Sequence, residues 1–178
     1  MLPQSRLLQL SLGGLLATAS ASLPSQAQTI TGSRGQYRAS ITVPVSPQKA
    51  WKVLTQYEAM AGVMPDIKQA RVLKRDGSQL ELAQTYQAPY TFGLPIRAKL
   101  RLVENAPKQL SYSLISGERI RSLSGSWTLT PVPGGVKLEH RIAIDPEIPS
   151  FLRSTYYELS EANLLESMRV LKRLMLNP

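Results

Sequence analysis

The stretch PSFLRSTYYELSEANLLESMRVLKRLML, residues 149–176, decides the fold because it predicts one long helix at the end of the chain. No proline or glycine interrupts it after Pro149, so the helix has room for about 40 Å at ~1.5 Å per residue. Apolar residues recur at helical spacing and predict one buried stripe, made of Tyr157, Leu164, Leu165, Met168, Leu171 and Met175. Such a stripe needs an apolar surface to cover.

The sequence before this helix has the pattern of an antiparallel meander. Turn residues divide it at 76–77, 89–95, 105–107, 117–118 and 133–135. Strands are predicted at 67–75, 79–88, 96–104, 109–116, 120–130 and 136–145. Parallel neighbours would need a crossover helix between them, so the short connections favour antiparallel pairing.

Alternation along the strands separates an apolar sheet face from a solvated one. The apolar face includes Ile96, Ala98, Leu100, Leu102, Val136, Leu138, His140, Ile142 and Ile144. Arg97, Lys99 and Arg101 lie on the opposite face. The closing helix is therefore expected to cover the apolar face.

The segment upstream of the meander predicts one more strand and two short helices. Residues 37–45 alternate as a half-buried strand does, and Ser46 with Pro47 has the cap and first-turn chemistry of a helix start. Residues 58–65 predict a second short helix that Pro65 ends. The expected fold is α+β, with a seven-stranded antiparallel sheet, two short helices after strand 1 and a long C-terminal helix.

This order of elements resembles the helix-grip fold of the START-like and Bet v 1-like (SRPBCC) superfamily, and within it the polyketide cyclase/dehydrase and coenzyme Q-binding branch. The residues that carry the resemblance are Val45-Ser46-Pro47, Trp51, Leu54, Tyr57, Met64-Pro65, Tyr86, Pro89 and Phe92. Asp66 departs from the pattern, since an aromatic residue commonly follows this proline in the coenzyme Q-binding branch. The resemblance covers roughly residues 35–176 and implies a curved sheet that grips the long helix around a largely apolar cavity.

Residues 1–27 have the composition of an export signal. Arg6 is followed by an apolar stretch at 7–16 and then by small residues ending in Ala27. The apolar stretch is shorter than the ~20 residues of a membrane-spanning helix, so cleavage is favoured over a retained anchor. The expected organisation is a signal peptide at 1–27, a polar linker at 28–35 and one domain at 36–176, working in a bacterial periplasm or in the lumen of an internal membrane.

Composition excludes several classes of enzyme. The chain has 178 residues, a formal net charge of +9, no cysteine and one histidine. Thiolate chemistry and sites built from several histidines or cysteines are therefore excluded. Phosphate-binding loops, a nucleophile elbow and an HExxH motif are missing from the sequence. We predict no metal, no cofactor and no assigned catalytic residue.

The candidate ligand-binding residues lie on inward faces. From the strands they are Tyr86, Tyr112, Trp127 and His140, and from the helix Leu164 and Met168. For the two tyrosines and the tryptophan, core packing and a cavity wall are both open. For His140 three roles are open: a hydrogen-bonded core residue, a polar contact to a ligand, or a general base.

Phe92 completes the predicted lining from a loop bounded by Pro89 and Pro95. It is interpreted as a gate of the cavity, as a tip that touches a membrane, or as part of an ordinary packed loop. On the outer face of the sheet, Arg97, Lys99 and Arg101 predict either a solvated strand face or a patch that attracts anionic lipid headgroups.

The favoured function is an exported monomer that binds or carries a hydrophobic molecule such as a lipid, quinone or isoprenoid. One alternative is an enzyme of the polyketide cyclase/dehydrase kind, with His140 and Tyr86 or Tyr112 as its polar groups. Another is an interaction module that binds membranes through the basic sheet face. Nucleic acid is not expected as a partner, despite the positive charge.

Overall fold

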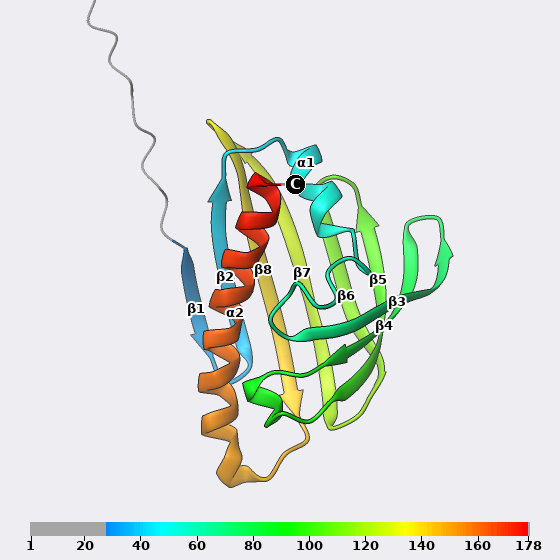
Figure 1. Ribbon diagram of the computed structural model, residues 1–178, viewed down its shortest axis with the longest axis vertical. Helices are drawn as coiled ribbons and strands as arrows, with labels where there is room; N and C mark the ends of the chain where they lie inside the picture. Colours follow the sequence, from blue (N-terminus) through cyan, green and yellow to red (C-terminus); the bar gives the residue numbers. More distant parts are fainter. Residues whose placement is uncertain (1–27, 178) are drawn as a thin grey trace, which may run out of the picture.

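The computed structural model describes residues 28–177, which form one curved, open antiparallel sheet with a long helix across it (Figure 1). The eight strands follow one another in space in the order β1-β2-β8-β7-β6-β5-β4-β3. The elements are β1 (Thr29–Ser33), β2 (Gln36–Val43), α1 (Pro47–Leu54), β3 (Ile67–Asp76), β4 (Gln79–Tyr86), η1 (Pro89–Thr91), β5 (Ile96–Asn105), β6 (Gln109–Gly117), β7 (Ile120–Val132), β8 (Gly135–Pro146), η2 (Ser150–Leu152) and α2 (Arg153–Leu176). The predicted signal peptide at 1–27 lies outside the described residues.

The prediction of seven strands was wrong, because β1 forms an eighth within the stretch predicted as a polar linker. It pairs antiparallel with β2 across a turn at Arg34 and Gly35, whose φ angles are 51° and 84°. Positive φ at both central residues is typical of a two-residue hairpin. Only one residue of β1 is half-buried and the others are exposed. The strand therefore has no alternation of apolar and polar residues from which it could be predicted.

The predicted second short helix at 58–65 was also wrong, and one α-helix, α1, follows β2. Gly62 has a φ of +76°, which ends any right-handed helix at that point. Its backbone N–H donates to the carbonyl oxygen of Ile67 at 2.8 Å instead of to a preceding turn. The segment is therefore a series of turns that carries Met60 and Met64 into the core.

The start of α1 is as predicted from the sequence. Ser46 is its N-cap, and the Oγ of Ser46 accepts a hydrogen bond from the backbone N–H of Lys49 at 3.2 Å. Pro47 is the first helical residue, where the missing N–H costs nothing. Ala50, Val53 and Leu54 form the buried face.

Alternation assigned the two faces of the sheet correctly. Ile96, Ala98, Leu100 and Leu102 are all buried, whereas Arg97 and Arg101 between them are exposed. The same inward alternation along β2 and β8 buries Tyr37, Ala39, Ile41, Val43, Val136, Leu138 and His140. The buried face is the concave one, which α2 crosses (Figure 1).

The closing helix begins as the short 3-10 turn η2 and continues as α2. Its buried residues are Tyr156, Leu164, Ser167, Met168, Val170, Leu171 and Met175. Tyr157 and Leu165, predicted in the buried stripe, are only half-buried. The stripe is rotated from the predicted one because polar residues of α2 also face inward.

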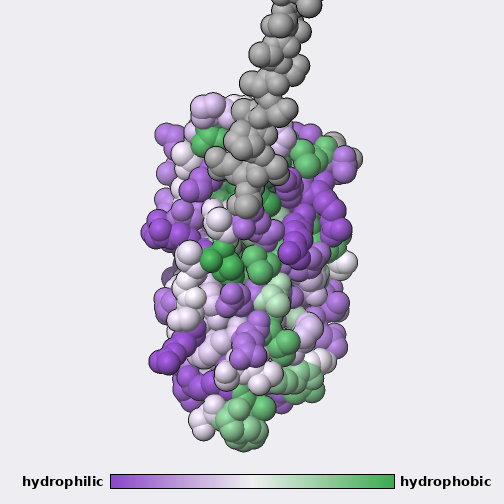
Figure 2. Space-filling model, turned by 90° about the vertical axis from the view of Figure 1, so that its left-hand side faces the viewer, coloured by the Kyte–Doolittle hydropathy of each residue, from purple (hydrophilic) through white to green (hydrophobic). Residues whose placement is uncertain are grey.

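The surface over β1 and α2 is mixed in polarity, with apolar side chains gathered at its lower end (Figure 2). Phe151 of η2, just before α2, is 80% exposed. Along residues 28–177, no helix combines the length and the apolar character needed to cross a bilayer.

Candidate functional site

A cavity of about 240 Å³ lies between the concave face of the sheet and α2. Its wall is mostly apolar and is built by every major element that faces the helix. Leu82, Leu100, Leu102, Leu110, Leu123, Ile142 and Ile144 contribute from the strands, and Leu164 and Leu171 from α2. The volume is somewhat below the ~300–1,000 Å³ of typical ligand pockets, so a compact apolar molecule fits best.

Six of the seven predicted lining residues are on the cavity wall: Tyr86, Phe92, Tyr112, Trp127, His140 and Leu164. Met168, the seventh, is fully buried in the core next to the cavity and does not line it. Whether any of these residues contacts a ligand stays a prediction.

His140, on β8, is held by two aromatic residues: Trp127 of the adjacent strand β7 and Tyr112 of β6, the next strand beyond it. Its Nε2 shares a hydrogen bond of 2.8 Å with the hydroxyl of Tyr112, and its ring stacks on Trp127 with 3.9 Å between centroids and 4° between planes. Burial lowers the pKa of His140 to about 3, because no nearby charge compensates the lost hydration of an imidazolium. The imidazole is therefore neutral at physiological pH, and its buried Nδ1 has no partner among the described residues.

Gly125, on β7, makes the contact between Tyr112 and His140 possible. It lies directly opposite Tyr112 of β6 and Ile142 of β8 in the sheet. A Cβ at this position would collide with the Tyr112 hydroxyl and with the carbonyl oxygen of Arg141. Because Gly125 has no side chain, the ring of Tyr112 can cross over β7 and reach His140.

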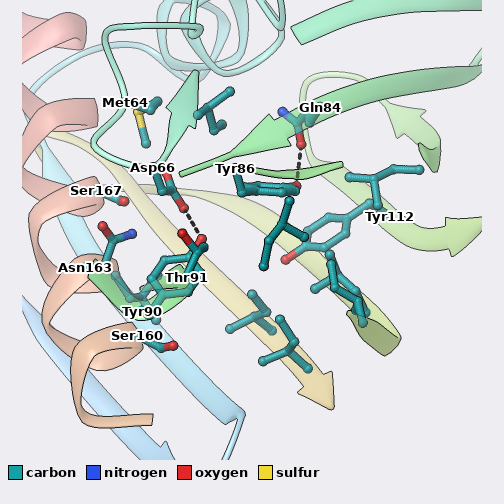
Figure 3. Close-up of a pocket in the computed structure, with 18 of the residues that line it drawn as sticks. Met64, Asp66, Gln84, Tyr86, Tyr90, Thr91, Tyr112, Ser160, Asn163 and Ser167 are labelled. Atoms are coloured by element: carbon teal, nitrogen blue, oxygen red, sulfur yellow. Dashed lines mark hydrogen bonds between the residues drawn. The ribbon is translucent and has the colours of Figure 1, made fainter. Parts of the chain in front are cut away.

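A group of polar side chains forms one wall of the cavity, and we call it the Asp66 cluster: Asp66, Tyr90, Ser160, Asn163 and Ser167. Asp66 directly precedes β3, Tyr90 belongs to η1, and the other three project from α2 toward them (Figure 3). The hydroxyl of Tyr90 donates to Oδ2 of Asp66 at 3.1 Å, and the side-chain amide of Asn163 lies near enough to this carboxyl group to lower its pKa. The cluster joins three elements that are far apart in the sequence.

The electrostatics of the cluster are dominated by Asp66. Burial raises the pKa of its carboxyl group, and the hydrogen bond from Tyr90, the backbone of Asp66 itself, the nearby amide of Asn163 and the charge of Lys68 only partly oppose that rise. Burial together with the negative charge of Asp66 also raises the pKa values of Tyr86 and Tyr90. Every phenol that faces the cluster is consequently a neutral hydrogen-bonding group at physiological pH.

Sequence reasoning missed the cluster although one signal for it was present. Ser160, Asn163, Ser167 and Leu171 follow the i, i+3, i+7 and i+11 spacing of a single helix face. Three polar residues on such a face indicate that the helix covers a partly polar surface. Asp66 was noted only as a departure from the family pattern. A carboxyl group where an aromatic residue is common was the second indication of a polar region in the cavity wall.

Phe92 ends the η1 turn with a φ of 55° and is 42% exposed while also lining the cavity. It therefore lies where the cavity approaches the surface.

Tyr86 lies within the cavity wall, where its hydroxyl donates to Oε1 of Gln84 at 2.5 Å (Figure 3).

The basic residues of β5 are on the outer sheet face, as predicted, but two of them are paired with acids. Arg97 contacts Glu118 at 3.3 Å, and Lys99 contacts Glu81 at 2.7 Å. These pairs reduce the net positive charge of the patch. A role of Arg97, Lys99 and Arg101 at membranes stays a prediction.

The part of the chain that the structure describes contains no group of three or more histidine, cysteine, aspartate or glutamate side chains able to hold a metal ion. The Asp66 cluster has one carboxylate and otherwise neutral oxygen and nitrogen donors. Its chemistry is that of hydrogen bonding to a bound molecule.

Solved structures share this fold at low sequence identity. The protein TTHA0849 from Thermus thermophilus is 17% identical, with a TM-score of 0.70 over 78% of this chain and 95% of that one. The STAR-related lipid transfer protein from Xanthomonas axonopodis is 20% identical, with a TM-score of 0.63 over 84% and 90%. The di-domain ARO/CYC StfQ of the steffimycin biosynthetic pathway is 16% identical, with a TM-score of 0.66 over 79% of this chain and 50% of that one.

At these identities the structural likeness establishes the fold alone, and no curated protein matches the chain significantly. The sequence itself matches one family over residues 34–175, which includes every strand from β2 onward and nearly all of α2. That family is described as polyketide cyclase / dehydrase and lipid transport. The chain belongs to this family, within the START-like superfamily that its fold resembles.

Proposed function

We propose that this protein binds a compact hydrophobic molecule with one polar end in the cavity beneath α2, and that it serves as a carrier. The observation that carries the proposal is the cavity itself, whose wall is apolar except at the Asp66 cluster. An apolar pocket with a few convergent polar groups is the common form of a small-molecule site. The lipid transfer named for the Xanthomonas structure supports the same class of cargo.

The family also contains cyclases and dehydrases, so catalysis is the second candidate. The contact between Tyr112 and His140 is the observation that favours it. A pKa of about 3 makes His140 a weak base, however, because proton transfer is most efficient when the catalytic pKa lies near the working pH. Binding without chemistry is therefore the better proposal. Unchanged turnover of a cyclisation substrate by His140→Ala would remove this pair from the enzyme alternative.

We also propose that the protein is exported, on the composition of residues 1–27. Mass spectrometry of the protein purified from its native cells is expected to give an N-terminus near residue 22 or 28, after Ala21 or Ala27. A retained Met1 would contradict cleavage.

Filling the cavity is expected to weaken binding strongly. Leu164 is a buried residue of the cavity wall on α2, whereas its neighbour Leu165 is half-buried and does not line the cavity. Leu164→Trp is expected to lower the affinity for the fluorescent probe 1-aminoanthracene by about tenfold or more, because the indole takes the volume that the probe needs. Fluorescence titration measures the effect.

Leu165→Trp is the matched control and is expected to keep the affinity of the wild type. A native organic extract of the wild type should contain an apolar compound in stoichiometric amount, and the Leu164→Trp protein should lack it. Equal binding by both variants, or no binding by the wild type, would contradict the proposed site.

A further inference from the structure

The Asp66 cluster is a polar end of the cavity whose central group is a carboxyl without a cation. None of the ion pairs formed within residues 28–177 includes Asp66. The side chains that act on it most closely, Tyr90 and Asn163, are both neutral, and Tyr90 donates a hydrogen bond to it. Lys68, the charged residue that acts on it, is exposed and two positions along the strand. A half-buried carboxyl group on the cavity wall with these neutral partners is incompletely compensated when it is ionised.

The surroundings of the Asp66 cluster disfavour the binding of an anion there. The groups that face Asp66 across the cavity are the phenols of Tyr86 and Tyr156 and the hydroxyls and amide of α2, none of which carries a positive charge. His140 is neutral as well, since its pKa is about 3. A ligand carboxylate or phosphate placed beside Asp66 would find no cation to compensate it, and it would also meet a like charge wherever Asp66 is ionised, in a medium of low dielectric constant where such interactions are strong.

Arg119 is the one basic residue on the cavity wall, and it belongs to a different region. It lies at the turn between β6 and β7, with a φ of 57° and an exposed side chain. Its backbone carbonyl accepts from the N–H of Glu147 at 2.8 Å, which ties the turn to the segment after β8. No contact joins Arg119 to Asp66 among the described residues, so this cation does not compensate the carboxyl group.

From this arrangement we infer that the Asp66 cluster selects the polar end of the ligand: it accepts an amphiphile whose head donates a hydrogen bond and carries no negative charge, and it rejects the corresponding anion. An alcohol or an amine satisfies this requirement, since either donates to the carboxyl oxygens of Asp66. Ser167 supplies a hydroxyl oxygen near it on α2 that can accept a second hydrogen bond, and Ser160 supplies another farther along the cavity wall (Figure 3). The inference rests on the proposed function and adds the class of ligand.

Three ligands of equal chain length test the inference: 1-decanol, decylamine and decanoate, each displacing 1-aminoanthracene at pH 7.5. The wild type is expected to bind the alcohol or the amine about tenfold or more tightly than decanoate, because an anion beside Asp66 is buried without a counter-ion. The alcohol and amine arms tell which donor is preferred. Equal or tighter binding of decanoate would overturn the inference.

Asp66→Asn is expected to bring the affinity for decanoate to within about threefold of that for decanol, because the amide removes the charge and keeps the shape. Asp76→Asn is the matched control, since Asp76 is an exposed carboxylate at the far end of the same strand, β3. That control is expected to keep the wild-type preference. An Asp66→Asn protein that still rejects decanoate as strongly as the wild type would also overturn the inference.

Failure of the inference and failure of the proposed function give different results. If no probe or ligand binds the wild type, the carrier proposal fails and the inference fails with it. If 1-aminoanthracene binds but the three ligands are not discriminated, only the inference fails. The comparison within the wild type needs no variant, so it remains decisive even if Asp66→Asn does not fold.

Discussion

Replacing Gly125 by alanine is expected to lower the free energy of unfolding by about 3 kcal/mol or more, although it adds only one methyl group. The added Cβ would occupy the place of the Tyr112 hydroxyl and would press on the carbonyl oxygen of Arg141. Tyr112 must then leave His140, which breaks a partly buried hydrogen bond, and the β7–β8 ladder must shift. Urea denaturation measures the change in the free energy of unfolding.

Gly117→Ala is the matched control in the neighbouring strand β6. The nearest atom to its new Cβ is Cδ1 of Leu114 at 3.1 Å, the end of a flexible side chain that can move aside. We expect a cost of about 1 kcal/mol or less for this variant. Similar costs for the two variants would show that the ring of Tyr112 does not depend on the space at Gly125.

Replacing His140 by phenylalanine is expected to remove an acid sensitivity of the fold. The pKa of His140 is about 3 in the folded protein and about 6.5 in the unfolded chain. Between pH 6.5 and pH 3 the histidine is protonated in the unfolded state but not in the folded state. The free energy of unfolding therefore falls as the pH falls. The loss approaches about 1.4 kcal/mol per pH unit below pH 6 and amounts to about 2 kcal/mol between pH 6.5 and pH 4.5.

Phenylalanine keeps a flat ring against Trp127 but takes up no proton. The variant loses the hydrogen bond to Tyr112, which lowers its stability by a constant amount at every pH. The decisive quantity is therefore the slope: urea midpoints of the wild type should fall more steeply from pH 7 to pH 4.5 than those of the variant. Parallel curves would mean that His140 accepts a proton inside the folded protein.

Two features make this comparison clean. The chain has one histidine, so no other imidazole titrates in this range. The raised pKa of Asp66 acts in the opposite direction, because the folded state then takes up a proton before the unfolded state does. That contribution is present in both proteins and cancels in the difference between their slopes.

The strands that border the core could be predicted because burial on one face imposes a period of two. β5 and β8 show this, since every second residue from Ile96 to Leu102 and from Val136 to His140 is buried. β1 has no such constraint, as it is an exposed edge strand held to β2 by backbone hydrogen bonds. The turns at 58–65 misled in the other direction, because their methionines are spaced as in a helix while Gly62 reverses the chain.

The aromatic part of the candidate site could be predicted for the same reason as the strands. Tyr112, Trp127 and His140 occupy inward positions, and the sheet register places Trp127 beside His140. Their mutual geometry could not be predicted, since it depends on the space left at Gly125. Met168 shows the limit of a helical stripe: the pattern identifies a buried residue without telling the core from the cavity wall.

The sequence by itself determined the class of fold, because the order of periodic segments and turn residues allows few arrangements that bury every apolar face. The tertiary structure alone decided the polar end of the cavity. Asp66, Tyr90 and Asn163 come from a turn, a loop and the closing helix, and only the angle at which α2 crosses the sheet brings them together. The physical reason is that periodicity records burial along one segment, whereas a site depends on distances between segments.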